Sequence, residues 1–120
     1  MSDYQNLHVS AEATANIETL KDKYKFSTFA SALKFAIIYA LKYHKNDMNF
    51  DQLDKLYPSD GTNLHVGTVD EDGILRRLIP ILYKDCDTPY RYARVAAIYG
   101  AEKICVKLKE GENVSFSDLL

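Results

Sequence analysis

The stretch TFASALKFAIIYALKYHK, residues 28–45, constrains the fold of this chain more than any other segment. Its apolar side chains cover most of the circumference of a helix and leave a narrow polar stripe of Ser27, Ser31, Lys34, Lys42 and Lys45. A helix that is apolar nearly all round must be buried on nearly all sides. Because 120 residues contain little other protein to surround it, we predict a core shared with a second copy, in a homodimer or a higher oligomer. The alternative is a central helix that is wrapped by its own domain.

The residues before this helix predict a short strand followed by a first helix. Apolar and polar residues alternate over residues 6–9, which is the period of a strand. Ser10 can cap a helix at its N-terminus, and apolar residues at helical spacing extend that helix over about residues 11–25. A break follows, after which Ser27-Thr28 can cap the second helix. Residues 1–46 are therefore predicted to form a strand and a helix-turn-helix pair.

The rest of the chain, residues 47–120, predicts further short helices within the same single domain of residues 1–120. The expected elements are a helix near residues 49–56, a turn at 57–63, a helix over 74–84 that Pro80 kinks or divides, and a helix from Pro89 to Gly100. Residues 103–109 suit either a short strand or a last helix, and Ser115–Asp118 predicts a closing turn. The fold class is therefore mainly α, with an oligomeric core.

One tetrapeptide occurs twice, because Asn63–Val66 repeats the sequence of Asn6–Val9. The residues on either side of the two copies do not repeat, whereas a structural repeat would extend over 20 residues or more. We therefore predict no duplicated unit.

Charge is arranged in blocks, although the totals of 15 basic and 17 acidic residues nearly cancel. Residues 21–45 contain six lysines against Asp22, a net charge of +5, and residues 76–109 contain eight basic against three acidic side chains, again +5. The stretches around them are acidic. Solvated helix faces explain either block by itself, and the alternative is a phosphate-facing surface assembled by folding or oligomerisation. The net charge of −2 excludes a generic polycation.

The sequence contains no motif typical of an enzyme or a metal centre. It lacks the glycine-rich loops that bind dinucleotides or nucleoside triphosphates, and its three histidines lack metal-ligand spacing. Asp85 and Asp87 flank Cys86, and negative neighbours raise the pKa of a thiol, which disfavours a nucleophile. We therefore predict a non-enzymatic protein without cofactor or metal.

The remaining composition predicts a cytoplasmic protein without a membrane partner. No apolar run approaches the length of a membrane span, and the first residues do not have the pattern of a secretory signal. The two cysteines, Cys86 and Cys105, have no partner spacing and suit reduced thiols.

The order of strand, helix, turn and helix resembles the ribbon-helix-helix family of DNA-binding proteins. The residues that carry the resemblance are Leu7–Ser10, Ile17–Lys21 and Phe26–Ile37. In that family the strand pairs with a second chain, and alternate polar residues of the ribbon enter the major groove. The resemblance implies that Asn6 and His8 face the bases. It also implies that Ser27 and Thr28, at the start of the second helix, face a phosphate. The glycine that is usual between the two helices is absent here.

Over more of its length the chain resembles the small E component of the Dnd system for DNA phosphorothioation. The resemblance rests on the length, the helix pair, a middle segment from Gly61 to Gly73, and the closing segment Val114–Leu120. That family is helical and oligomeric and is implicated in binding DNA backbones, especially nicked duplex. The resemblance implies an accessory factor in DNA modification, with other proteins of a modification complex as further partners.

These observations together predict a non-enzymatic DNA-binding protein that contacts the phosphate backbone as an oligomer. The cations of the two basic blocks would neutralise phosphates, so that affinity falls steeply with salt. The predicted phosphate contacts are Lys21, Lys23, Lys25, Lys34, Lys42, Arg76, Arg77, Arg91 and Arg94. The alternative is a protein-interaction module, an accessory subunit or an inhibitor encoded on a mobile element, whose Tyr90, Tyr92 and Tyr99 dock a protein partner.

Overall fold

The computed structural model describes residues 2–112, which form a mainly helical fold with one small sheet. The sheet consists of strands β1 (Asn6–His8) and β2 (Asn63–His65). The helices are α1 (Ala11–Tyr24), α2 (Phe29–Tyr43), α3 (Phe50–Leu56), α4 (Val66–Val69), α5 (Ile74–Leu82) and α6 (Pro89–Lys109). The prediction of a mainly α fold that begins with a short strand is confirmed. The predicted closing turn at Ser115–Asp118 and the segment Val114–Leu120 lie outside the described residues.

The starts of α1 and α2 are set by the two predicted capping residues. Ser10 Oγ accepts a hydrogen bond from the Ala13 N–H at 3.0 Å, and Thr28 Oγ1 accepts one from the Ser31 N–H at 3.1 Å. Between the helices, Lys25 has left-handed backbone angles (φ 58°, ψ 43°) and closes the last turn of α1. Lys25 therefore occupies the conformation for which glycine is usual at a helix end.

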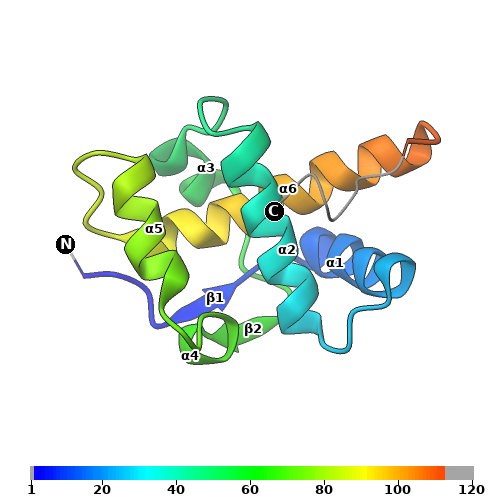
Figure 1. The fold of residues 1–120 in the computed structure, drawn as a ribbon, viewed down its shortest axis with the longest axis horizontal. Helices are drawn as coiled ribbons and strands as arrows, with labels where there is room; N and C mark the ends of the chain where they lie inside the picture. Colours follow the sequence, from blue (N-terminus) through cyan, green and yellow to red (C-terminus); the bar gives the residue numbers. More distant parts are fainter. Residues whose placement is uncertain (1, 113–120) are drawn as a thin grey trace.

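The long helix α6 crosses the molecule from α5 to the end of α1 and packs against α2 (Figure 1). It continues through Gly100, where the sequence predicts its end, as far as Lys109. A Cβ atom at Gly100 would collide with the carbonyl oxygen of Ala36 and would lie 3.2 Å from the Cβ of Ala40. Gly100 therefore permits α2 and α6 to cross closely rather than ending a helix, and residues 103–109 are helical.

Helix α2 is buried mainly by its own chain. α6, α1 and α4 all pack against it, and Leu33, Ala36 and Ile37 are fully buried, whereas Lys42 and Tyr43 remain exposed. The alternative prediction, a central helix wrapped by its own domain, accounts for the apolar circumference. The pattern of this helix therefore no longer requires a second copy, and oligomerisation stays a prediction.

Helix α5 is amphipathic and short. It runs without interruption through Pro80, which lies near its C-terminal end, so the helix is not divided there. None of the helices within residues 2–112 combines the length and the apolar character needed to cross a membrane.

The two strands pair with each other inside the chain. They are antiparallel, with Leu7 opposite Leu64 at the centre of the register. Backbone hydrogen bonds extend the pairing on both sides, because the Val9 N–H donates to the Thr62 carbonyl and the Val66 N–H donates to the Gln5 carbonyl, each at 3.0 Å. β2 thus takes the place beside β1 that a second chain takes in a ribbon-helix-helix protein.

Candidate nucleic-acid interface

Four polar side chains lie on the outer face of the β1–β2 ribbon. Successive residues of a strand point to opposite sides of the sheet, and Leu7 points inward because only 1% of it is exposed. Asn6 and His8 therefore point outward, and so do Asn63 and His65 on the neighbouring strand. Asn6, Asn63 and His65 are exposed and His8 is half-buried. The structure thus brings the two predicted ribbon residues together on one surface and adds Asn63 and His65 to them.

The ribbon has an approximate two-fold symmetry that the sequence did not reveal directly. Both strands read Asn-Leu-His, and their register places Asn6 opposite His65 and His8 opposite Asn63. A two-fold axis through the central leucine pair therefore exchanges the two strands. The signal that could have found Asn63 and His65 was the repeated tetrapeptide. Although the flanking residues do not repeat, the two copies meet as paired strands.

Hydrogen bonds determine which ring nitrogen of each histidine carries the proton. His8 Nε2 lies 3.0 Å from the Gly61 carbonyl oxygen, which can only accept, so Nε2 is the donor and Nδ1 of the neutral ring is an acceptor. His65 Nδ1 accepts from the Gly67 N–H at 3.0 Å, so its Nε2 carries the proton in the neutral ring. Neutral His8 therefore offers an acceptor to a ligand, whereas neutral His65 offers a donor.

Three predicted phosphate contacts gather at the C-terminal end of α1. Lys23 and Lys25 are exposed and Lys21 is half-buried, and none of the three forms an ion pair with another residue of the described segment 2–112. Because α1 begins directly after the ribbon and rises 1.5 Å per residue, these lysines lie about 20 Å from the ribbon. The end of α1 is therefore a basic site at the far end of the helix that follows the ribbon.

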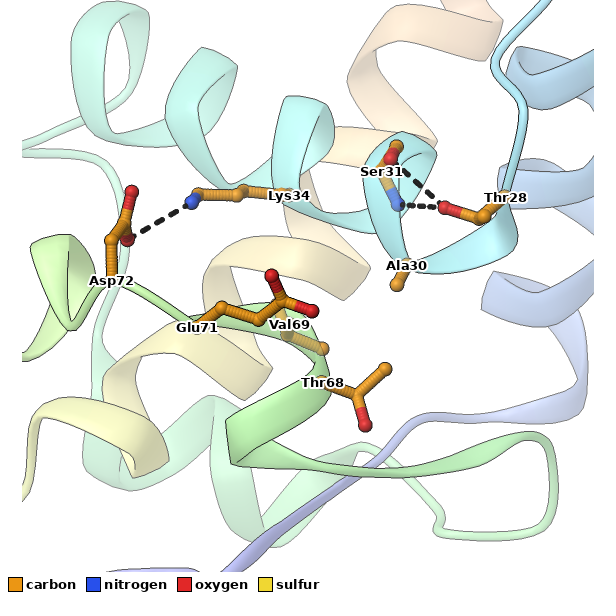
Figure 2. A pocket seen from close by; sticks show the side chains of 8 residues that line it. All are labelled: Thr28, Ala30, Ser31, Lys34, Thr68, Val69, Glu71 and Asp72. Atoms are coloured by element: carbon orange, nitrogen blue, oxygen red, sulfur yellow. Dashed lines mark hydrogen bonds and ion pairs between the residues drawn. The ribbon is translucent and has the colours of Figure 1, made fainter.

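The N-terminus of α2 opens onto a pocket of about 440 Å³ rather than onto a basic surface. Glu71 and Asp72, from the turn between α4 and α5, line this pocket together with Thr28 and Lys34 (Figure 2). Lys34 Nζ lies 3.5 Å from Asp72 Oδ1. The Lys34 charge is therefore already offset by a carboxylate.

The charge of this pocket opposes a phosphate. A hydrogen bond from the Ile74 N–H, together with the nearby Lys34 ammonium, lowers the pKa of Asp72, so that its carboxylate is ionised at neutral pH. The Thr28 hydroxyl donates to Ser31 Oγ at 2.9 Å, as Figure 2 shows. The structure thus places Thr28 and Lys34 in a pocket with two carboxylates, and exposed Ser27 directly precedes Thr28.

Arg94 is buried, which corrects its prediction as a DNA contact. Only 3% of it is exposed, and all three guanidinium nitrogens donate hydrogen bonds within the chain. The acceptors are the His8 carbonyl (2.7 Å), the Asp54 carbonyl (3.2 Å) and Oδ1 (2.9 Å), the Tyr57 carbonyl (2.8 Å), the Pro58 carbonyl (3.1 Å) and Ser59 Oγ (3.0 Å). Arg94 therefore ties β1 and the turn after α3 to α6 and cannot reach a phosphate.

Arg91 belongs to the same network. Its Nε lies 3.1 Å from Asp54 Oδ2 and its Nη2 lies 3.3 Å from Asp51 Oδ1. The hydrogen bond to Asp54 raises the pKa of Arg91 above its ordinary value. The Tyr4 hydroxyl also donates to Asp54 Oδ2, so one buried carboxylate holds two arginines and a tyrosine. Arg91 is thus held by two carboxylates, and its role as a DNA contact stays a prediction.

The last three predicted contacts are exposed. Arg76 and Arg77 lie in the first turn of α5, and Lys42 Nζ lies 5.4 Å from the centroid of the Tyr43 ring. Within residues 2–112 none of the three forms an ion pair. The available cations are therefore distributed over α1, α2 and α5 rather than gathered at one place.

Comparisons with known proteins add no assignment. No protein-family model matches the chain, and searches of curated proteins and of solved structures find no match. Among the described residues, no three or more His, Cys, Asp or Glu side chains are arranged to hold a metal ion. The function must therefore be argued from the ribbon and from the exposed cations.

Proposed function

We propose that this chain is a non-enzymatic DNA-binding protein whose β1–β2 ribbon enters the major groove. The observation that carries the proposal is the shared outer face of Asn6, His8, Asn63 and His65. A two-stranded ribbon fits the width of the major groove, and an asparagine amide can bind N6 and N7 of adenine with two hydrogen bonds. The amides of Asn6 and Asn63 have no hydrogen-bond partner among the described residues, so both are free to make such contacts.

The phosphate contacts in this proposal come from Lys21, Lys23 and Lys25. These lysines form no ion pair in the described segment, so neutralising phosphates costs no existing interaction. The finer parts of the proposal, binding as an oligomer and a role as an accessory factor in DNA modification, rest on the resemblance to the Dnd component.

The tyrosines that would dock a protein partner in the alternative function are engaged inside the fold. The Tyr90 hydroxyl donates to Asp70 Oδ2 at 2.9 Å. The Tyr92 ring stacks on Phe50 with centroids 4.0 Å apart, and Tyr99 packs edge-on against His44. Since all three are half-buried and have partners inside the fold, they offer a protein partner only part of their surface, which favours DNA binding over docking through these tyrosines.

Fluorescence anisotropy with labelled duplexes tests the proposal. The affinity should fall steeply between about 50 mM and about 200 mM salt, with a slope of about 0.9 per phosphate contact. The double variant Asn6→Ala/Asn63→Ala should narrow the affinity difference between preferred and random duplexes by about tenfold while leaving the salt slope unchanged. The variant Lys23→Ala should reduce the slope by about 1 on every duplex.

The matched control is Asn46→Ala. Asn46 is exposed and lies in the turn between α2 and α3, outside the ribbon and outside α1, so this variant should bind as the wild type does. Binding that is absent at the lower salt, or that is insensitive to salt, contradicts the proposal. If Asn46→Ala narrowed the affinity difference between preferred and random duplexes as much as Asn6→Ala/Asn63→Ala does, the ribbon would not face the bases.

A further inference from the structure

The outer face of α5 presents apolar and basic side chains that nothing in residues 2–112 covers. On the inner side of the helix, Leu75 and Ile79 are fully buried. On the outer side, Ile74 is 45% exposed and Ile81 is 77% exposed. Ile74, Arg77 and Ile81 follow one another at helical spacing along a single line, and Arg76 and Pro80 are exposed beside this line. We call these five residues the α5 face.

The charges of the α5 face restrict what can cover it. Arg76 and Arg77 form no ion pair among the described residues. Complementary interfaces pair a cation with an anion and exclude like charges. The α5 face of a second copy is therefore a poor partner. Arg77 lies between the two isoleucines, so in an antiparallel pair of α5 helices it would lie next to the partner's Arg77, and the two like charges would repel each other. DNA phosphates would match the arginines but would leave Ile74 and Ile81 without an apolar contact.

The matching chemistry occurs in this chain after α6. Residues 110–120 contain three carboxylates and no cation, and residues 113–120 read NVSFSDLL. In this sequence Asp118 stands among large apolar side chains, namely Val114, Phe116, Leu119 and Leu120. We propose that residues 113–120 of a second copy bind the α5 face, with Asp118 close to Arg77 and the apolar side chains on Ile74 and Ile81.

A second copy is required because the segment is too short to reach the α5 face of its own chain. α5 packs against the N-terminal half of α6, where the Tyr83 and Tyr92 rings lie 5.4 Å apart, and the end of α6 lies at the opposite end of the molecule (Figure 1). The helix rises about 25 Å between Tyr92 and Lys109. A fully extended chain from Lys109 to Asp118 spans about 30 Å. Only about 5 Å would remain for Asp118 to pass α5 to its outer side, which is less than the diameter of a helix, about 10 Å.

Sedimentation velocity of the full chain over a range of concentrations tests this inference. The wild type should associate reversibly. Deletion of residues 113–120, or the substitution Ile81→Asp, should weaken the association about tenfold or more, because each removes the apolar contact. Arg77→Glu should weaken it as well, and Arg77→Glu combined with Asp118→Arg should restore it, since the charges then match again in reverse.

The control is Leu56→Asp on α3, where the leucine is 69% exposed and outside the α5 face, and its association should equal that of the wild type. Circular dichroism confirms that each variant is folded. A wild type that remains monomeric at every concentration overturns the inference, and so does association that survives either the deletion or Ile81→Asp. Loss of binding to DNA or to anionic vesicles in Ile81→Asp, with self-association unchanged, would assign the face to another occupant. The inference does not depend on DNA binding.

Discussion

Two pairs of arginines in the same basic stretch of sequence have opposite environments. Half-buried Arg91 and buried Arg94 on α6 are both held by Asp54, and Arg94 also by backbone carbonyls. Arg76 and Arg77 on α5 are exposed and have no ion pair within residues 2–112. All four lie in one segment with a net charge of +5. The difference teaches that the charge of a segment does not distinguish arginines that stabilise a fold from arginines that can bind a partner.

The cause of the difference is the position of the two helices. α6 passes through the centre of the molecule, so its polar side chains must find partners among buried groups, because an unpaired buried charge is costly. α5 lies at the periphery (Figure 1), where water solvates the guanidinium groups. The comparison can therefore be tested by asking how much each position tolerates change.

The largest effect is expected for Arg94→Lys. A lysine cannot supply the planar set of donors that the six acceptors around Arg94 require, so the free energy of unfolding should fall by about 3–5 kcal/mol. Urea unfolding followed by circular dichroism measures it. The matched change Arg76→Lys on α5 should alter the free energy by less than about 0.5 kcal/mol. If the two substitutions changed the free energy of unfolding by amounts within about 1 kcal/mol of each other, the contrast between the arginines of α6 and those of α5 would be wrong.

A second effect is expected at alkaline pH, where buried phenols resist ionisation. Burial is the main reason that the pKa of Tyr57, Tyr83 and Tyr90 rises from 10.0 to about 12. The stability that these neutral phenols contribute should be complete below pH 10 and should decline as the pH rises from about 10 to about 12, because the unfolded chain releases its protons first.

Tyrosinate absorbance and urea unfolding, measured together across this range, check the expectation. Tyr90→Phe should flatten the decline, since it removes one of the three phenols, whereas Arg77→Ala on the α5 face should leave the curve as it is. Ionisation of all nine tyrosines in one step near pH 10, in a chain that is still folded, is the contrary outcome.

The smallest effect concerns a third kind of cation, whose position depends on its backbone rather than on a partner. Lys25 has a positive φ of 58°, which favours glycine. Lys25→Gly should therefore raise the free energy of unfolding by about 0.5–1 kcal/mol. Lys23→Gly, inside α1, should lower it by about 1 kcal/mol. Thermal unfolding of the two variants measures both changes, and a destabilised Lys25→Gly would show that its side chain is needed after all.

Local signals predicted the N-terminal part of the fold well and its packing poorly. Ser10 and Thr28 cap helices within three residues of themselves, so a short window of sequence contains the whole interaction. Gly100 misled the prediction because its neighbour Ala36 is far away in the chain, and a local reading could only treat the glycine as a helix end. Of the candidate site, Asn6 and His8 were predicted, whereas Asn63 and His65 required the pairing of the strands.

By itself the sequence determined the class of fold, the positions of α1 and α2 and the absence of familiar catalytic motifs, because helical periodicity and capping act over a few residues. Only the tertiary structure decided which chain supplies the strand beside β1, what surrounds α2, and which arginines face water. Those outcomes depend on contacts such as the one between Arg94 and His8, which are 86 positions apart. Such a contact forms only when the whole chain has folded around α6.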